Sequence, residues 1–183
     1  TLGLVGESGS GKSTISKCIL RINDSIEGEI IYNKRNIKSI TPKIFRKNVQ
    51  LVFQDPFSSL NPEMKIGDSI LEPMNVHKIF KKSERKNEVI KLLEDVGLKK
   101  EDFHKYPTQF SGGQRQRIVI ARALSVKPEI IICDESVSAL DVSVQSQVLN
   151  LLNDLKEIYS ITLLFISHDL SLIHISEPTR LVS

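Results

Sequence analysis

The chain has 183 residues, of which 40% are hydrophobic and 26% are charged, and its formal net charge is +3. This length and composition suit one globular α/β domain with a core of its own. No stretch reaches the roughly 18 to 20 uninterrupted apolar residues that span a bilayer, so we expect any membrane link to come through a partner. The tightest basic group is Lys78, Lys81, Lys82, Arg85 and Lys86, and we interpret it as a solvated helix face in preference to a nucleic-acid or lipid patch, which usually needs a denser cluster or stacking aromatic residues as well.

The first predicted elements are a strand, a glycine-rich loop and a helix. Residues 2–5 form a short apolar run that we interpret as a buried strand, and we expect the N-terminal edge of the domain to precede Thr1. Apolar residues at helical spacing follow the loop. Residues 30–32 and 49–53 are predicted strands, and Pro42 lies between them in a segment that turns or begins a short helix.

The second half alternates helices and strands. Ser83 is a predicted N-cap of a helix that ends at Gly97, and Ser111 caps a helix that reaches Leu124. Residues 129–133 and 161–166 are apolar runs typical of strands buried on both faces, and a helical stripe at 144–158 separates them. Strands that alternate with helices predict a mainly parallel sheet, here with a helical insert at about 61–108.

The glycine-rich loop carries the first chemical motif. Residues 6–14 read GESGSGKST and match the pattern G-x-x-x-x-G-K-[ST] between a strand and a helix, a context that a chance glycine-rich turn would lack. Glycines let backbone amides approach phosphates, and a helix N-terminus favours negative charge. We expect Lys12 to reach the β- and γ-phosphates and Ser13 to bind Mg²⁺. The nucleotide-binding residues predicted here are Gly6, Glu7, Ser8, Gly9, Ser10, Gly11, Lys12, Ser13 and Thr14.

Two carboxylates end the strand at 129–133. Asp134 and Glu135 lie at the carboxyl end of the strand, where ligands bind in open α/β sheets. We expect Asp134 to hold Mg²⁺ through water, and Glu135 to act as the general base or water-orienting carboxylate for attack on the γ-phosphate. An acidic pair after a strand is more often a helix cap, but the phosphate loop in the same chain favours catalysis.

A third motif predicts a second anion-binding surface. Residues 110–117 read FSGGQRQR, which places a serine hydroxyl, two glycines and exposed amides at a helix N-terminus. A capped helix with a flexible start accounts for the serine but not for two such surfaces in one chain. This segment resembles the signature motif of the ABC-type ATPases.

The resemblance implies the P-loop NTPase fold of the ABC ATPase type and roles for further residues. Gln54 resembles the glutamine that senses Mg²⁺ and faces the membrane subunit. Residues 138–141 resemble the D-loop, which includes Asp141, and His168 resembles the switch histidine at the γ-phosphate. Since the chain has two phosphate-binding helix starts but one P-loop lysine, we expect a head-to-tail dimer, with a second copy or a related ATPase subunit. ATP would then lie between Lys12 of one domain and Ser111, Gly112, Gly113 and Gln114 of the other.

A closer resemblance lies in FQDPFSSLNP at residues 53–62, together with 110–117 and 137–142. These segments are similar to the ATP-binding subunits of oligopeptide and dipeptide permeases, a group that includes nickel importers. The resemblance implies ATP hydrolysis at the cytoplasmic face of the membrane, through transmembrane permease subunits and indirectly a solute-binding protein. It does not distinguish a peptide from nickel or another solute as the cargo.

The chain departs from this family at three places. The aromatic residue that stacks on adenine would precede Thr1, and Ser136 stands where the family has proline. After Ile173 the likeness ends. We therefore expect a partial nucleotide-binding domain at 1–173 and interpret residues 174–183 as translated sequencing-adapter read-through outside the fold.

Two other functions fit parts of the pattern. A soluble ABC ATPase acting on nucleic acid or ribosomes would resemble the repair enzymes, whose two motif halves are separated by long coiled coils or zinc modules, whereas ordinary domain sequence joins Lys12 to Asp134. A regulatory domain that binds ATP without hydrolysis would not need Lys12, Glu135 and His168 together.

Overall fold

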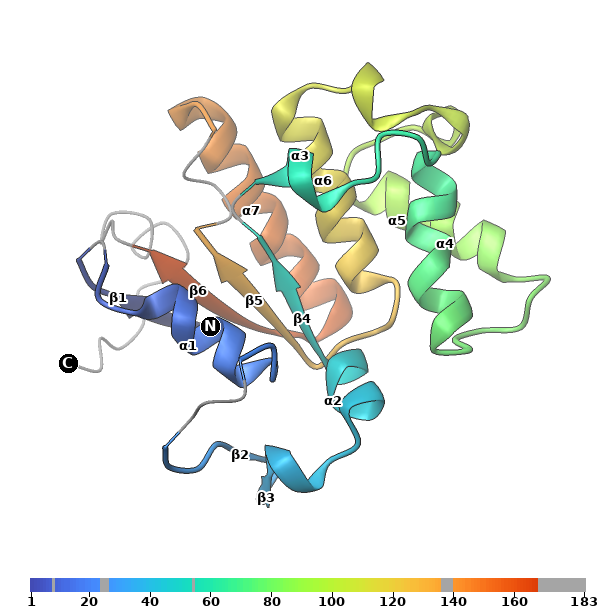
Figure 1. The fold of residues 1–183 in the computed structure, drawn as a ribbon. Helices are drawn as coiled ribbons and strands as arrows, with labels where there is room; N and C mark the ends of the chain where they lie inside the picture. Colours follow the sequence, from blue (N-terminus) through green and yellow to red (C-terminus); the bar gives the residue numbers. More distant parts are fainter. Residues whose placement is uncertain (8, 24–26, 54, 136–139, 168–183) are drawn as a thin grey trace.

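The computed structural model describes residues 1–7, 9–23, 27–53, 55–135 and 140–167 (Figure 1). Among these residues a four-stranded sheet has the order β1-β6-β5-β4, formed by Leu2–Val5, Thr162–Ser167, Ile130–Asp134 and Val49–Val52. Every pair is parallel, and Ile132 of β5 is in register with Leu51 of β4 and Leu164 of β6. The predicted α/β fold with a parallel sheet is confirmed.

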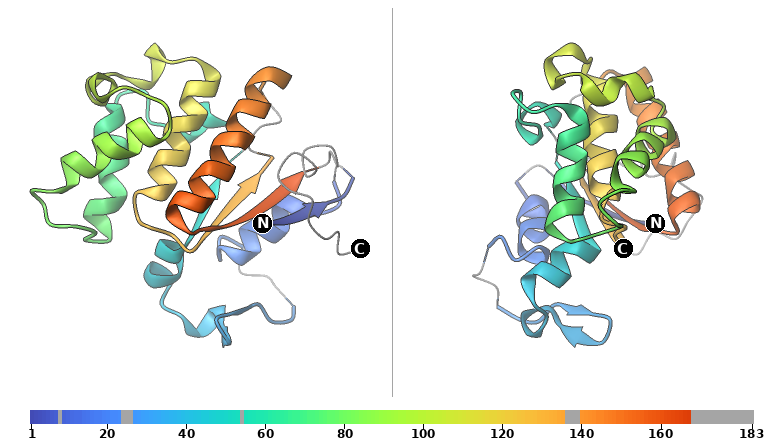
Figure 2. Two further views of the ribbon diagram at one scale, coloured as in Figure 1. Left: turned by 180° about the vertical axis from the view of Figure 1, so that it is seen from behind. Right: turned by 90° about the vertical axis from the view of Figure 1, so that its right-hand side faces the viewer.

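Side chains that alternate along the central strands supply two cores, one on each face of the sheet. Ile131 and Cys133 of β5 pack with α6, Gly112–Leu124, and α7, Val142–Tyr159. Ile130 and Ile132 belong to the opposite core with α1, Lys12–Ile19, and α2, Pro42–Asn48. Figure 2 shows α1 on one side of the sheet and α6 and α7 on the other. The loop between β1 and α1 lies at the carboxyl ends of the strands, because it follows β1 and every strand of the sheet is parallel.

The region predicted as a helical insert contains helices that pack beside α6 (Figure 1). They are α4, Ile66–Val76; α5, Arg85–Asp95; and the short 3-10 helices η2, Lys100–His104, and η3, Pro107–Gln109. α3, Pro56–Ser59, precedes them. Ile70, Met74, Val89 and Leu93 are buried there in the same core as α6. Whether 61–108 moves as a separate subdomain stays a prediction. In the described ranges, no helix has the length and apolar character needed to cross a bilayer.

The predicted N-cap at Ser83 is wrong. The N-cap of α5 is Glu84, because residues 82–84 form a turn in which the Glu84 amide donates to the Lys81 carbonyl at 2.9 Å. Arg85 then donates through Nε to the Ile79 carbonyl at 2.9 Å, so this member of the basic group supports the turn and does not simply face solvent. The predicted end of the helix is confirmed, since Gly97 follows the C-cap with a left-handed φ of 75°.

Two further details differ from the sequence predictions. β1 is not buried: it pairs with β6 alone among the described strands, and Leu2 is 53% exposed. The predicted strand at 30–32 is β2, Ile31–Tyr32, but it pairs with an unpredicted antiparallel partner, β3, Arg35–Asn36, which leads into the 3-10 helix η1, Ile37–Ser39. The two residues between the strands, Asn33 and Lys34, both have positive φ, as a tight hairpin turn requires.

Candidate active site

The loop between β1 and α1 depends on glycine at two positions. Gly9 and Gly11 have φ values of 82° and 92°, in the left-handed region that side chains with a Cβ rarely adopt. Gly11 is also the N-cap of α1, so the chain enters the helix directly from this turn. The amides of the first helical turn therefore face the loop without intrahelical acceptors, as an anion-binding loop requires.

Lys12 is the first residue of α1 and is only 6% exposed. Its ammonium group donates to the carbonyl oxygens of Gly6 at 2.7 Å and Glu7 at 2.6 Å, and lies 3.4 Å from Ser10 Oγ. The loop thus curls around a buried cation. This cation and the N-terminal end of the helix dipole together give the loop a positive potential.

Asp134 lies at the end of β5 and is 7% exposed. Two hydroxyl groups of α1 donate to its carboxylate: Ser13 Oγ to Oδ1 at 3.1 Å and Ser16 Oγ to Oδ2 at 2.8 Å. The structure therefore brings together Ser13 and Asp134, which the sequence predicted as Mg²⁺ ligands. Ser16 was missed, although its place three residues after Ser13 puts it on the same helix face.

Glu135 follows β5 in a left-handed conformation, with φ of 47°. Its amide donates to the Ile166 carbonyl of the neighbouring strand at 2.9 Å, which fixes the backbone in this uncommon conformation. Non-glycine residues held this way occur preferentially at functional sites. In the described part of the chain, Glu135 lines an open pocket of about 280 Å³ with Gly9, Gly11, Lys12, Ser13 and Thr14.

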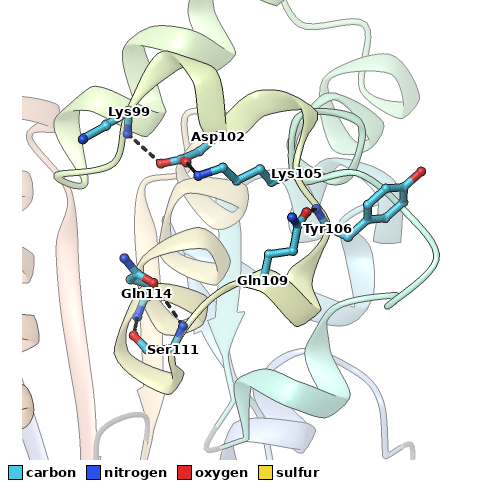
Figure 3. A network of polar contacts seen from close by, with 7 residues as sticks. All are labelled: Lys99, Asp102, Lys105, Tyr106, Gln109, Ser111 and Gln114. Carbon is cyan, nitrogen blue, oxygen red and sulfur yellow. Dashed lines mark hydrogen bonds and ion pairs between the residues drawn. The ribbon is translucent and has the colours of Figure 1, made fainter.

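The segment that leads to α6 repeats one hydrogen bond between a side chain and a backbone amide, and the last of these bonds is at Ser111 (Figure 3). Three times, an acceptor side chain reaches back to the amide three residues earlier: Asp102 to Lys99 at 2.9 Å, Gln109 to Tyr106 at 2.9 Å, and Gln114 to Ser111 at 3.0 Å. The Gln114 amide in turn donates to Ser111 Oγ at 3.4 Å, which completes a capping box. The predicted cap at Ser111 and the helix to Leu124 are confirmed.

The two glycines after Ser111 also have a packing role. A Cβ at Gly113 would lie 2.5 Å from Val144 Cγ1 of α7, and a Cβ at Gly112 would lie 3.6 Å from Leu140 Cδ2. Figures 1 and 2 place the start of α6 apart from the loop before α1, and no residue of α6 is among the described residues that line the pocket. The structure thus joins the P-loop to the strand-end carboxylates but leaves the signature segment elsewhere in the same chain.

The remaining predicted site residues have different outcomes. Ser8, Gln54 and His168 lie outside the described residues. Asp141 is the exposed N-cap of α7, and its side chain accepts no capping hydrogen bond within the described part of the chain. These four assignments stay predictions, as do the nucleotide-binding, metal-binding and catalytic roles of the other site residues.

A glycine loop joins a strand to a helix, and the lysine and serine at the start of this helix share one site with the two carboxylates at the end of β5. This arrangement defines a P-loop nucleotide-binding fold. The family model described as ABC transporter matches residues 1–138, so the chain belongs to the ABC transporter family. The oligopeptide transport ATP-binding protein OppF of Bacillus subtilis is 52% identical over 178 residues, which cover 94% of this chain and 58% of that protein. The glutathione import ATP-binding protein GsiA of Escherichia coli K12 is 51% identical over 176 residues, which cover 94% of this chain and 28% of that protein.

Solved structures agree with this assignment. The dimeric ATP-binding cassette MJ0796, in a post-hydrolysis state with ADP and Pi, aligns with a TM-score of 0.80 and 29% identity over 95% of this chain and 77% of its own. The cbiO1 protein of Clostridium perfringens, part of the ABC transporter complex cbiONQ, aligns with a TM-score of 0.84 and 25% identity over 96% of this chain and 69% of its own. The chain spans little more than half of OppF and less of GsiA.

Proposed function

We propose that the chain is the nucleotide-binding domain of an ABC importer's ATP-binding subunit, and that it binds and hydrolyses ATP with Mg²⁺. One observation carries this proposal: Lys12 and Ser13 of α1 and the strand-end residue Glu135 line one pocket, and Ser13 bonds to Asp134 beside it. A phosphate cradle, a metal-ligand pair and a carboxylate for water are the parts that phosphoryl transfer to water needs.

The phosphate groups of ATP would bind against the loop at 6–14. Gly9 and Gly11 allow the backbone to turn its amides toward the anion, and Lys12 supplies a cation that need move only a short way from the loop carbonyls. Thr14 lines the same pocket. This mode of phosphate binding does not depend on an aromatic residue that stacks on adenine.

The Ser13 hydroxyl and the Asp134 carboxylate fit a Mg²⁺ site. They lie 3.1 Å apart, and Mg²⁺ sites in such proteins use one or two protein oxygens together with phosphate oxygens and water. The ion would neutralise charge on the β- and γ-phosphates. The Ser16 hydroxyl donates to Asp134 Oδ2 and so orients this carboxylate. Gln54 is the third Mg²⁺ ligand that the family resemblance implies.

Glu135 is the proposed base for hydrolysis. Its left-handed backbone sets it beside the pocket, where its carboxylate would orient the attacking water and accept a proton from it. His168 is proposed, from the resemblance alone, to contact the γ-phosphate. In this proposal Glu135 and His168 both lie close to the γ-phosphate of the bound nucleotide.

A head-to-tail dimer would complete the site. We propose that Ser111, Gly112, Gly113, Gln114 and Asp141 of one domain face the nucleotide on Lys12 of the other. The separation of α6 from the pocket within one chain supports this, and the related cassette MJ0796 is dimeric with ADP and Pi. Amides at the start of α6 would stabilise γ-phosphate charge where the interface excludes water.

The proposed transport role places this domain at the cytoplasmic face of a membrane, bound to separate permease subunits and served by a solute-binding protein. The named relatives act in oligopeptide transport and glutathione import, which favours a small peptide as cargo over nickel. Reconstitution of the complete importer in vesicles tests the proposal. ATP-dependent uptake of labelled oligopeptide would support it, whereas ATP hydrolysis that no peptide or nickel stimulates would contradict it.

A further inference from the structure

Ser16 is a fully buried serine of α1, with 0% exposure, where this helix packs against β5. Its hydroxyl oxygen lies 2.8 Å from Asp134 Oδ2 and 2.9 Å from the Ser13 carbonyl oxygen, but the hydroxyl has one proton to donate. An ionised acceptor gives a stronger hydrogen bond than a neutral one, and a carbonyl inside a helix already accepts from the amide four residues later. The Ser16 proton therefore belongs to the bond with Asp134.

The two oxygens of the Asp134 carboxylate have different surroundings. Oδ1 accepts at 3.1 Å from the hydroxyl of Ser13, a residue that lines the pocket. Oδ2 accepts from Ser16, which has no exposed surface. One carboxylate oxygen is thus on the side of the pocket and the other is held between α1 and β5. The two hydroxyl groups together fix the rotation of the carboxylate.

This division bears on which divalent cation the site prefers. Mg²⁺ is small, demands nearly octahedral geometry and keeps several of its waters, so a single carboxylate oxygen suits it. Ca²⁺ is larger, takes more oxygen ligands and often binds both oxygens of one carboxylate. A carboxylate with one oxygen bonded to a buried hydroxyl offers the first kind of ligand and withholds the second.

We propose that Ser16 is a positioning residue that makes the site selective for Mg²⁺ over Ca²⁺, because it holds Asp134 Oδ2 away from the cation. The inference rests on the proposed function, in which Ser13 and Asp134 hold the cation that accompanies ATP. Without the Ser16 hydroxyl, Oδ2 would lose its donor in a buried place, which is unfavourable. The carboxylate would then turn toward the pocket, where both oxygens could reach a cation.

The test compares Ser16→Ala with its parent, the complete protein carrying Glu135→Gln, which keeps ATP intact during the titration. Isothermal titration calorimetry measures the affinity for ATP with saturating Mg²⁺, with saturating Ca²⁺ and with EDTA. We expect the alanine variant to bind ATP about tenfold more weakly with Mg²⁺, as is typical when a residue that orients a metal ligand is lost. The loss with Ca²⁺ should be much smaller, and the affinity in EDTA should not change.

Two further variants separate the hydroxyl from its surroundings. Ser125→Ala, at the C-cap of α6, also removes a buried hydroxyl, one that donates to the Arg122 carbonyl at 2.7 Å, and it should leave all three affinities unchanged. Ser16→Thr keeps a hydroxyl at the same position and should keep the preference for Mg²⁺. Ser16→Cys, with a weak donor, repeats the test if the alanine variant fails to fold.

Each other outcome has a defined meaning. Equal losses with Mg²⁺ and Ca²⁺, or no loss with either, would overturn the inference while the proposed function stands. An equal loss in EDTA would also overturn it, because the hydroxyl would then support the phosphate loop and not the cation site. A threonine variant that is as stable as the parent in urea but loses the preference for Mg²⁺ would contradict it too. A parent whose affinity for ATP is the same in EDTA and in Mg²⁺ would refute the proposed function and this inference with it.

Discussion

Lys12 and Asp134 are both charged and buried. Lys12 donates to the carbonyl oxygen of Gly6, and the Asp134 carboxylate accepts from the Ser16 hydroxyl. Ligands bind at the carboxyl ends of parallel strands, and this rule was enough to predict that the lysine and the carboxylates would share one site. Ser16 was not predicted: its spacing from Ser13 puts both on one helix face, but only the fold shows that this face meets Asp134. Burial of both charges makes the site sensitive to single substitutions.

Lys12→Ala should weaken ATP binding by about 2 to 5 kcal/mol, because the phosphates lose a buried, hydrogen-bonded cation. Isothermal titration of the complete protein with MgATP measures the change. Lys17→Ala is the matched control, since Lys17 lies exposed in the last turn of the same helix. Equal affinities for Lys12→Ala and the parent would reject the phosphate-binding assignment.

Glu135→Gln should keep ATP binding but slow hydrolysis by roughly a hundredfold or more, because the amide preserves shape and removes the base. Single-turnover kinetics of the complete protein check this rate. Glu129→Gln, just before the opposite end of β5, removes a carboxylate that bonds to Asn48 at 3.2 Å and should leave hydrolysis unchanged. Hydrolysis at the parent rate by the Glu135 variant would remove this residue from the mechanism.

At the scale of elements, long segments with a strong period were predicted correctly and short polar ones were not. The apolar runs of β4, β5 and β6 and the helix after Ser111 match their predicted ranges within one or two residues. The Ser83 cap failed because a local turn and the bonds of Arg85 outweigh the preference of serine for N-caps. α3 was missed although Asp55 before Pro56 is a cap signal, since a one-turn helix has no period to detect.

Gly113→Ala should destabilise the protein by about 1 to 3 kcal/mol, because the added methyl group overlaps Val144, whose β-branched side chain has few alternative rotamers. Gly112→Ala adds a methyl at ordinary contact distance and serves as the control. Urea unfolding of the complete protein gives both free energies. Equal stabilities for the two variants would show that α6 and α7 can separate without cost.

Asp102 should stabilise the segment before α6 in a pH-dependent way. Burial opposes its ionisation, but hydrogen bonds from Lys105 and the Lys99 amide, with the charges of both lysines, hold the pKa of Asp102 below its usual value. A depressed pKa contributes stability that is fully present above the unfolded pKa of about 3.9 and is lost as the pH falls through the folded pKa. Asp102→Asn should therefore lower the unfolding free energy at pH 7 by about 1 to 3 kcal/mol, with a smaller deficit in acid. A deficit independent of pH would contradict the charge-based account.

For the whole molecule, alternation of strands and helices predicted the parallel sheet, yet it could not predict the strand order, which depends on contacts between residues far apart in sequence. It also misjudged β1, whose apolar sequence indicated burial although among the described strands it pairs with β6 alone and Leu2 is 53% exposed. At this scale, the P-loop and the signature segment lie at two separate places in one chain. It motivates a functional unit of two domains.

ATP-driven pairing tests that central claim most directly, through light scattering of the complete ATPase pair with Glu135→Gln in place. MgATP should convert monomers to dimers, and adding Ser111→Arg should abolish the conversion, because the arginine would occupy the space of the γ-phosphate contact. Thr41→Arg places the same side chain at the exposed N-cap of α2, at the other end of the molecule in Figure 1, and should leave dimer formation intact. A pair that stays monomeric with MgATP, or a Ser111→Arg variant that dimerises as the parent does, would contradict the account.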